Sequence, residues 1–337
     1  MELRTAQVLT DQIPAGHMPC PEPVAARPSS VSAGRVANID RLRILAAIGV
    51  VWFHTEGAAH GEIGYAGLPI FLLVFFSLIA SHGHTESTAR FARRRWDRLM
   101  VPWLFWSLVY GLCKIGKAVS AMDISAMRDM LSVECLLAGT HIHLWYLPYA
   151  FVSGLLIFVV NGWTSEISNI AVILVATIVG ASTLAAHATG VLGSHLMMPL
   201  SQWGYGLAAI PLGFAIGRCL TVPSRDTQRV LLFVISLIMV AVCSVLNVMG
   251  YSPLAVPYEL ATVLVCAAYA WSAGGNAFVA CVAPLTFGIY LIHPLIGYGL
   301  KSFIAAGQHP AVSIILTVCL SAIATFGLTK TPLRRFV

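Results

Sequence analysis

Residues 229–249 read RVLLFVISLIMVAVCSVLNVM, and Arg229 is the only charged residue in this stretch of 21. A helix that crosses the hydrocarbon core of a bilayer needs about 20 largely apolar residues. The stretch therefore predicts a membrane-spanning helix. Similar stretches recur along the chain, and their number decides the fold.

The composition of the whole chain agrees with a membrane protein. The 337 residues are 58% hydrophobic and only 10% charged, with a mean hydropathy of +0.82. An ordinary soluble domain has about 25% charged residues. So few charges cannot cover the surface of a water-soluble protein of this length, which excludes a soluble enzyme.

Ten stretches satisfy the length criterion for a spanning helix, so we expect an all-α, polytopic membrane helix bundle of about ten helices. They are 42–59, 66–82, 100–119, 143–161, 168–187, 197–217, 229–249, 255–273, 281–300 and 311–329. The first and the ninth carry polar residues that lower their hydropathy.

The basic residues predict the orientation of these spans. With ten spans, one side of the membrane holds both termini and 16 of the 20 basic residues: Arg4, Arg27, Arg35, Arg41, Arg43, Arg90, Arg93, Arg94, Arg95, Arg98, Arg218, Arg225, Arg229, Lys330, Arg334 and Arg335. Lys and Arg gather on the cytoplasmic side of membrane proteins. We therefore expect both termini in the cytoplasm, and we interpret the net charge of +6 as membrane topology, with no nucleic-acid partner.

Two domains are expected from the distribution of apolar residues. Residues 1–38 are rich in Pro, Ala, Ser and Val and have no long apolar run, which indicates a disordered cytoplasmic tail. Residues 39–337 form the membrane domain. The eight cysteines are scattered, with no CxxC pair, so we expect them to pack as small apolar side chains and to hold no metal.

Ionisable residues within apolar spans are the first candidates for function, because each is costly in lipid. Arg43 and His54 lie 11 residues apart in the first span, which is three helical turns or roughly 16 Å. They share a helix face, with the arginine near the cytoplasmic end. The plainer alternative is an interfacial arginine and a histidine that is hydrogen-bonded within the bundle.

A second candidate lies before the third span, where residues 93–98 read RRRWDR. Arg95 and Arg98 are three residues apart and face the same way on a helix. Guanidinium groups bind phosphate oxygens in pairs, so this spacing suits a phosphate ligand. The alternative is a basic cluster that contacts anionic lipid headgroups.

Two further groups lie toward the outer ends of spans. His143, Trp145 and Tyr146 open the fourth span, where Trp and Tyr are common at the interface but can also contact a sugar. Tyr290 and His293 share a face in the ninth span, just before Pro294. These groups predict a polar cavity between spans one, four and nine; hydrogen bonding between helices is the alternative.

Motifs of the common soluble chemistries do not occur in the sequence. There is no GxxxxGK[ST], GxGxxG, HExxH or GxSxG. Nucleotide hydrolysis and the usual hydrolase and zinc chemistries therefore lack support.

Together, these features resemble the acyltransferase type 3 family of integral membrane acyltransferases. The resemblance lies in Arg43-x10-His54, Arg95-x2-Arg98, the Leu-Trp-Tyr-Leu stretch at 144–147 and Tyr290-Leu-Ile-His293, in that order. It covers essentially residues 39–337. Each motif is short, and their order and spacing make the pattern specific.

The resemblance implies transfer of an acyl group, usually acetyl, from cytoplasmic acyl-CoA to a hydroxyl of a cell-surface or exopolysaccharide sugar, including a lipid-linked one. It implies His54 as the catalytic base, with Arg43 as its partner. It also implies Arg95 and Arg98 as ligands of the CoA phosphates. His143, Trp145, Tyr146, Tyr290 and His293 become substrate-binding or supporting residues, and the location becomes the cytoplasmic (inner) membrane, with no metal.

The chain departs from the family's pattern in the second span, where Phe75-Phe76-Ser77-Leu78 keeps a serine but lacks the glycine that often follows it. A close backbone approach is therefore not expected there. Some relatives carry an extracytoplasmic esterase-like domain, and we expect none here because the sequence ends at Val337.

Two other classes of function remain open from the sequence. A secondary transporter would line its substrate path with the same histidines and arginines, and it would show inverted repeats or paired broken helices. A catalytically silent membrane scaffold would tolerate the loss of His54. The acyl group, the acceptor and the choice between a general base and an acyl-histidine intermediate are also open.

Overall fold

The structure is a computed structural model, and it describes residues 30–82, 86–122, 132–192, 196–271, 273–301, 303 and 309–337. Every regular element within these residues is helical, which confirms the all-α prediction. The longer elements are α1 (Ser30–Phe53), α2 (Gly61–Tyr65), α3 (Gly67–Ser81), α4 (Thr88–Arg95), α5 (Val101–Ser120), α7 (Val133–Ala138), α8 (Tyr146–Trp163), α9 (Asn169–Ala188), α10 (Leu200–Gly206), α11 (Ala209–Cys219), α12 (Arg225–Val248), α13 (Ser252–Ala270), α14 (Ala277–Val282), α15 (Thr286–Lys301) and α16 (Pro310–Thr329). Four short turns complete the set: the π-helical η1 (Trp96–Met100) and the 3₁₀ turns η3 (Ile142–Trp145), η4 (Ala283–Leu285) and η5 (Pro332–Phe336).

Eight helical segments in the described part of the chain are long and apolar enough to cross a membrane. They are Gly61–Ser81, Thr88–Ser120, Ile142–Trp163, Asn169–Ala188, Arg225–Val248, Pro253–Ala270, Ala277–Lys301 and Pro310–Thr329. The protein is therefore a multi-pass membrane protein. Each of these eight corresponds to one of the ten expected spans.

The other two expected spans differ from the sequence prediction. The stretch 42–59 belongs to α1, which has 24 residues but carries Asp40, Arg41 and Arg43 in its middle. The stretch 197–217 is divided between α10 and α11, because the helix is interrupted at Leu207 and Ala208. Charge in one case and a helix break in the other explain why fewer segments qualify.

The start of α1 also differs from the expected domain boundary. The helix begins at Ser30, inside the segment that we expected to be a tail up to residue 38. Residues 1–29 lie outside the described residues.

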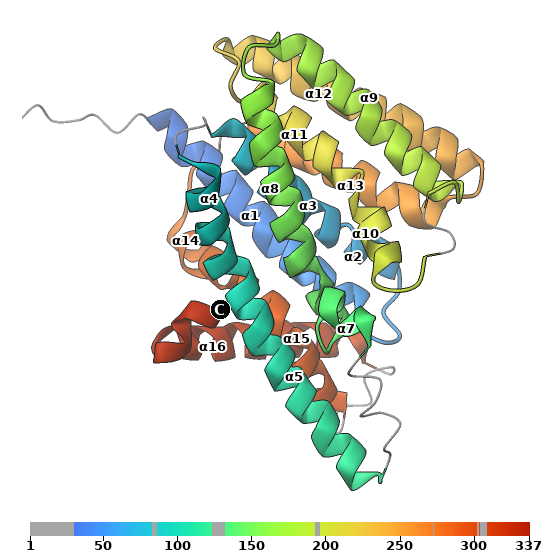
Figure 1. Ribbon diagram of the computed structural model, residues 1–337, viewed down its shortest axis with the longest axis vertical. Coiled ribbons are helices and arrows are strands. Elements are labelled where there is room, and N and C mark those ends of the chain that lie inside the picture. Colours follow the sequence, from blue (N-terminus) through green and yellow to red (C-terminus); the bar gives the residue numbers. More distant parts are fainter. Residues whose placement is uncertain are drawn as a thin grey trace, which may run out of the picture.

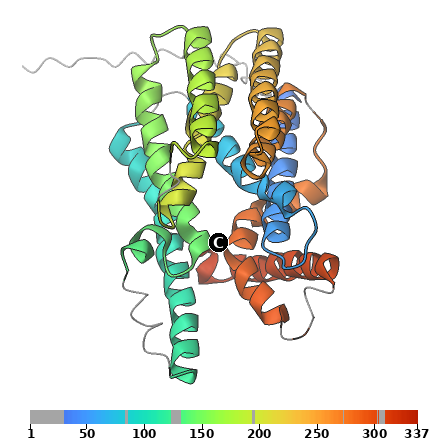
Figure 2. The same ribbon diagram turned by 90° about the vertical axis from the view of Figure 1, so that its right-hand side faces the viewer.

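The helices form a bundle in which most long helices run along one another (Figures 1 and 2). Helix α11 packs against α3 and α9, α12 packs against α13, and α15 packs against α16. Helix α16 runs across the direction of the long helices in both views. Helices α15 and α16 both contact α1 as well as each other, while α5 extends below them in both views.

Glycines allow α1, α2, α3 and α11 to approach one another at backbone distance. A Cβ atom at Gly49 of α1 would lie 2.7 Å from the carbonyl oxygen of Gly64 in α2. A Cβ atom at Gly213 of α11 would lie 2.6 Å from the Cβ atom of Phe76 in α3, and one at Gly217 would lie 2.5 Å from the carbonyl oxygen of Ser77. The expectation of no close backbone approach at Ser77 is therefore wrong, because the glycine that permits the approach lies on α11 and not on α3. Small residues are the usual means of close helix packing in membranes.

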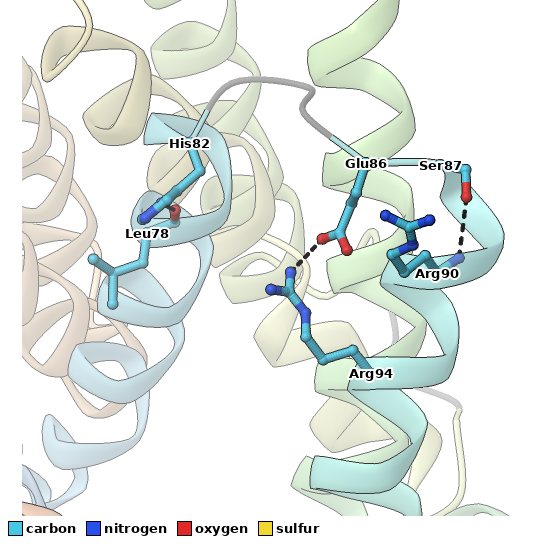
Figure 3. A network of polar contacts seen from close by, with 6 residues as sticks. All are labelled: Leu78, His82, Glu86, Ser87, Arg90 and Arg94. Carbon is cyan, nitrogen blue, oxygen red and sulfur yellow. Dashed lines mark hydrogen bonds and ion pairs between the residues drawn. The ribbon is translucent and has the colours of Figure 1, made fainter.

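The start of α4 is held by its own polar side chains (Figure 3). The hydroxyl of Ser87 accepts a hydrogen bond from the backbone N–H of Arg90, which caps the helix. The guanidinium of Arg94 pairs with the carboxylate of Glu86. Arg95, the next residue, lies over the rings of Phe75 and Phe91.

Candidate active site

A large cavity with an arginine-rich lining lies between α1, α3, the α4–α5 segment, α15 and η5. Its volume is about 990 Å³, at the upper end of the range for small-molecule sites. We call it the basic cavity. Its charged lining residues are Arg43, Arg95, Arg98, Arg334, Arg335, Asp40 and Asp97, and its aromatic lining residues are Phe71, Phe75, Tyr146, Tyr269, Phe287 and Tyr290.

Arg95 and Arg98 are the two arginines predicted to bind phosphate, and Arg95 is the more buried of them. Its guanidinium carbon lies 5.0 Å from the centre of the Phe75 ring and 5.1 Å from that of Phe91. Its Nε atom is buried and has no hydrogen-bond partner within the described protein. A half-buried cation with an unused donor is ready to bind an anion.

The local backbone brings Arg98 to the same cavity by a route that the sequence did not predict. Residues Trp96–Met100 form a π-helical turn between α4 and α5, with Arg95 at its start and Arg98 inside it. A π turn adds a residue to the helical repeat and occurs frequently at functional sites. Both arginines line the cavity, and their binding of phosphate stays a prediction.

Arg43 also lines the cavity, but it belongs to α1, far from Arg95 and Arg98 in the sequence. Its Nη1 atom lies 3.3 Å from Oδ1 of Asp40, one turn earlier on the same helix. The carboxylate neutralises part of this charge and orients the guanidinium. Sequence reasoning did not include Asp40 in the site, although the i, i+3 spacing to Arg43 was visible.

A second, smaller pocket of about 180 Å³ is lined by four histidines. We call it the histidine pocket, and its histidines are His54, His141, His143 and His293. His54 follows the last residue of α1, and it is exposed and lines this pocket. The rings of His54 and His293 are 5.4 Å apart, and those of His293 and His143 are 5.6 Å apart. The prediction that spans one, four and nine share a polar cavity is therefore met by the geometry of these rings.

His141 and His143 form a hydrogen-bonded pair at one end of the pocket. Their Nδ1 atoms are 2.6 Å apart, so one must donate while the other accepts. Burial, followed by the nearby Lys114 and His54, lowers the pKa of His141 to about 4. His141 is therefore neutral at physiological pH and can accept from His143 or donate to it.

His293 has a tautomer that its surroundings fix. Its Nδ1 atom lies 2.7 Å from the carbonyl oxygen of Tyr290, and a carbonyl can only accept a hydrogen bond. Nδ1 therefore carries the proton of the neutral ring, and Nε2 carries a lone pair. Nε2 is buried and has no partner among the described residues, while the ring lines the pocket. It is a hydrogen-bond acceptor available to a ligand or to His54.

Tyr290 separates the two cavities. Its ring lines the basic cavity, and its hydroxyl donates a hydrogen bond to the backbone carbonyl oxygen of His143, which lines the histidine pocket. The ring of Tyr146 lies 5.4 Å from that of Tyr290 on the side of the basic cavity. One layer of side chains thus separates a phosphate-compatible cavity from a group of imidazoles.

The structure places the predicted partners Arg43 and His54 in different cavities. Between them on α1, Ala47 and Val51 pack against Ile289 of α15 in a small apolar cluster. Arg43 is therefore in the same cavity as Arg95 and Arg98, and His54 is in the same pocket as His293. The catalytic roles of Arg43 and His54 remain predictions.

Four of the five supporting residues line the cavities, and Trp145 does not. His143 and His293 line the histidine pocket, while Tyr146 and Tyr290 line the basic cavity. The side chain of Trp145 lies in the hydrophobic core, with its ring 5.6 Å from that of Tyr149. It lines neither of these two cavities, so its geometry is that of a packing residue.

Arg334, Arg335 and His141 were missed as site residues. The first two were assigned to membrane topology, and no local signal in the sequence shows that η5 folds back onto the cavity. His141 did carry a signal, because His141-Ile-His143 lies next to a predicted site residue. In the described residues, no group of three or more His, Cys, Asp or Glu side chains could hold a metal ion.

The fold and the two cavities define a class: a multi-pass helical membrane protein with an arginine-rich cavity backed by a histidine pocket. The acyltransferase type 3 domain, described as an acyltransferase domain, matches residues 36–329. The chain belongs to this family and is a membrane acyltransferase. No curated protein and no solved structure matches the chain significantly.

Proposed function

We propose that the chain is an O-acyltransferase that moves an acyl group, acetyl in the simplest case, from acyl-CoA to a hydroxyl of a cell-surface or exopolysaccharide sugar. The phosphates of the donor bind in the basic cavity, and its thioester end passes the layer of side chains at Tyr290 to react at the histidine pocket. The observation that carries this proposal is the shared wall at Tyr290, which puts phosphate-binding arginines and imidazoles back to back.

The donor cavity has the charge that a CoA ester requires. Arg95 and Arg98 supply paired guanidinium donors for phosphate, and the aromatic lining can pack against the adenine and the pantetheine arm. The family membership supplies the acyl donor as a class. With both termini in the cytoplasm, as the basic residues favour, this cavity would be loaded from the cytoplasm.

His54 is the proposed reacting imidazole, because its ring is exposed in the pocket and lies beside that of His293. As a general base, neutral His54 takes the proton of the sugar hydroxyl while its oxygen attacks the thioester carbonyl. The C–S bond then breaks, and the imidazolium returns the proton to the CoA thiolate. In the alternative route, His54 itself attacks the thioester and forms an acyl-imidazole, which the sugar hydroxyl then cleaves.

The test compares membranes that contain wild-type protein, His54→Ala or His309→Ala at matched amounts. His309 is exposed at the start of α16 and lines neither cavity, so it controls for the loss of a histidine. Labelled acetyl-CoA and cell-envelope glycan are added, and base-labile label on the glycan is counted. We expect His54→Ala to lower the rate by about 100-fold or more, and His309→Ala to match the wild type.

Omission of the glycan separates the two routes. Base-labile label on the wild-type protein, absent from His54→Ala, indicates an acyl-imidazole; no label on the protein indicates a general base. Equal transfer by wild type and His54→Ala would remove His54 from the chemistry. Absence of transfer together with substrate uptake that needs no acyl-CoA would favour the transporter alternative.

A further inference from the structure

The C-terminal segment of the described chain is fixed against α5 by an aromatic anchor. The ring of Phe336 stacks on Phe105 with centroids 4.1 Å apart and an interplanar angle of 9°. The indole Nε1 of Trp106 donates a hydrogen bond of 2.9 Å to the carbonyl oxygen of Phe336. These contacts hold η5 beside the π-helical turn, and Figure 1 shows the end of the chain next to the junction of α4 and α5.

This anchor places two further arginines in the wall of the basic cavity. Arg334 and Arg335, in η5, line it together with Arg95 and Arg98. The guanidinium carbon of Arg335 lies 4.6 Å from the centre of the Phe336 ring. Within the described residues, neither arginine makes an ion pair with an acidic side chain. Both side chains are exposed and have donors free for a ligand.

The charge of the cavity exceeds what one phosphate group requires. Five arginines line it against two aspartates, and one of those aspartates is paired with Arg43. The arginines come from three separate places: α1, the α4–α5 segment and η5. Separate cationic groups around one cavity suit a ligand that carries phosphates at more than one position.

Resting on the proposed function, we infer that Arg334 and Arg335 form a second phosphate-binding group of the donor site. One arginine pair holds the pyrophosphate of the CoA ester and the other holds the phosphate on its ribose. The family match ends at residue 329, so this second group belongs to a segment beyond the part of the chain that carries the family likeness. The anchor formed by Phe105, Trp106 and Phe336 positions it.

A direct binding experiment tests this assignment with purified full-length protein in detergent. The dissociation constants of CoA and of dephospho-CoA, which lacks the ribose phosphate, are measured for the wild type and for the double variant Arg334→Gln/Arg335→Gln. Lys330→Gln is the matched control. Lys330 precedes the pair by four residues, and it lies over the ring of Phe326 and does not line the cavity.

We expect the double variant to bind CoA about tenfold more weakly or worse, because charge-assisted hydrogen bonds to phosphate are lost. Weaker binding of CoA alone assigns the pair to the ribose phosphate, and equally weaker binding of both ligands assigns it to the pyrophosphate. Lys330→Gln should leave both constants unchanged. Arg334→Lys/Arg335→Lys, which keeps the charges, should bind with intermediate strength and guards against a folding defect in the glutamine variant.

Unchanged constants in the double variant, with the wild type binding CoA, would overturn the inference and leave the proposed function standing. Failure of the wild-type protein to bind CoA would overturn the proposed function itself. Anionic lipid is the competing source of phosphate, so the measurement is repeated in nanodiscs with and without phosphatidylglycerol. An effect of the substitutions that appears only with the anionic lipid would assign the pair to headgroups and overturn the inference.

Discussion

The basic cavity and the histidine pocket differ in size, in charge and in the way the chain builds them. The basic cavity has more than five times the volume of the histidine pocket, about 990 Å³ against about 180 Å³. Its arginines belong to three distant parts of the sequence and are largely exposed. In the histidine pocket, the ring centroids of His54 and His293 are 5.4 Å apart, and those of His293 and His143 are 5.6 Å apart. His143 and His293 are buried.

Under the proposed function, this difference assigns donor binding to one cavity and proton transfer to the other. A wide cavity with many cations provides affinity for a large anion, and each contact contributes a limited share. A small pocket with fixed imidazoles provides the geometry for proton transfer, where each nitrogen counts. Substitutions in the basic cavity should therefore act on donor affinity, and substitutions in the histidine pocket should act on turnover.

The largest effect after that of His54 is expected at His293. Its substitution tests most directly whether the histidine pocket acts on turnover and not on donor affinity. His293→Asn keeps an N–H near the Tyr290 carbonyl but removes the Nε2 lone pair. We expect kcat to fall by about 100-fold, with little change in the KM of the donor. His293→Gln, which restores an acceptor near Nε2, should recover part of the rate. A rise in the KM of the donor without a fall in kcat would contradict the assignment of turnover to the histidine pocket.

Arg95 provides the corresponding test in the basic cavity. Arg95→Gln removes a cation held between Phe75 and Phe91, and we expect the donor KM to rise by about tenfold or more. Steady-state kinetics with varied acyl-CoA measure this. Arg93→Gln is the control, because Arg93 is exposed on the same helix and does not line the cavity. A fall in kcat at unchanged KM would place Arg95 in the chemistry instead.

Tyr290 lies in the wall between the two cavities. Its substitution should therefore change both kcat and the KM of the donor, but by less than the substitutions of His293 and Arg95. Tyr290→Phe removes the donor to the His143 carbonyl and should lower the free energy of unfolding by about 1–3 kcal/mol. Tyr258→Phe is the matched control, since its buried hydroxyl donates to the carbonyl of Tyr205 at 2.6 Å, and Tyr258 lines neither cavity. Thermal unfolding should show similar losses for the two variants. Only Tyr290→Phe should also change kcat and KM; identical kinetics would mean that the wall has no part in the reaction.

The smallest effect concerns the dependence of stability on pH. The pKa of His141 is lowered to about 4 in the folded protein, chiefly by burial, while the unfolded chain titrates near the ordinary value of 6.5. Between pH 6.5 and pH 4 the unfolded state therefore binds more protons, and stability falls as the pH is lowered. We expect the unfolding temperature to drop less between pH 7 and pH 5 in His141→Gln than in the wild type. Equal drops would show that His141 titrates normally in the folded protein.

The sequence predicted those features that depend on local patterns. Apolar length predicted the eight segments that are long and apolar enough to cross a membrane. The i, i+3 spacing of Arg95 and Arg98 predicted that the two side chains face the same way, and both line the basic cavity, although Arg98 lies in a π-helical turn. His54, His143 and His293 come from the first, fourth and ninth expected spans and line one pocket, although His54 follows the end of α1 and His143 lies in η3. These inferences need only the chain's own periodicity and hydropathy.

Features that depend on contacts between distant segments could not be predicted. Nothing near Arg334 indicates that Phe336 will stack on Phe105, some 230 residues away. Similarly, the helix face shared by Arg43 and His54 did not reveal that Ile289 of another helix would close the space between them. Side-chain packing between helices decides both, and it leaves no periodic trace in one sequence.

The glycine contacts of the bundle determine which parts of the donor site can adapt to its ligand. Helices α1, α2, α3 and α11 approach one another so closely at Gly49, Gly67 and Gly217 that a Cβ atom there would lie within 2.7 Å of a backbone oxygen of the neighbouring helix. We therefore expect these helices to shift little, so that the wall that α1 and α3 contribute to the basic cavity keeps its shape. Under the proposed function, we expect adjustment to donors with acyl chains of different length in the opposite wall, where η1 and η5 carry Arg98, Arg334 and Arg335.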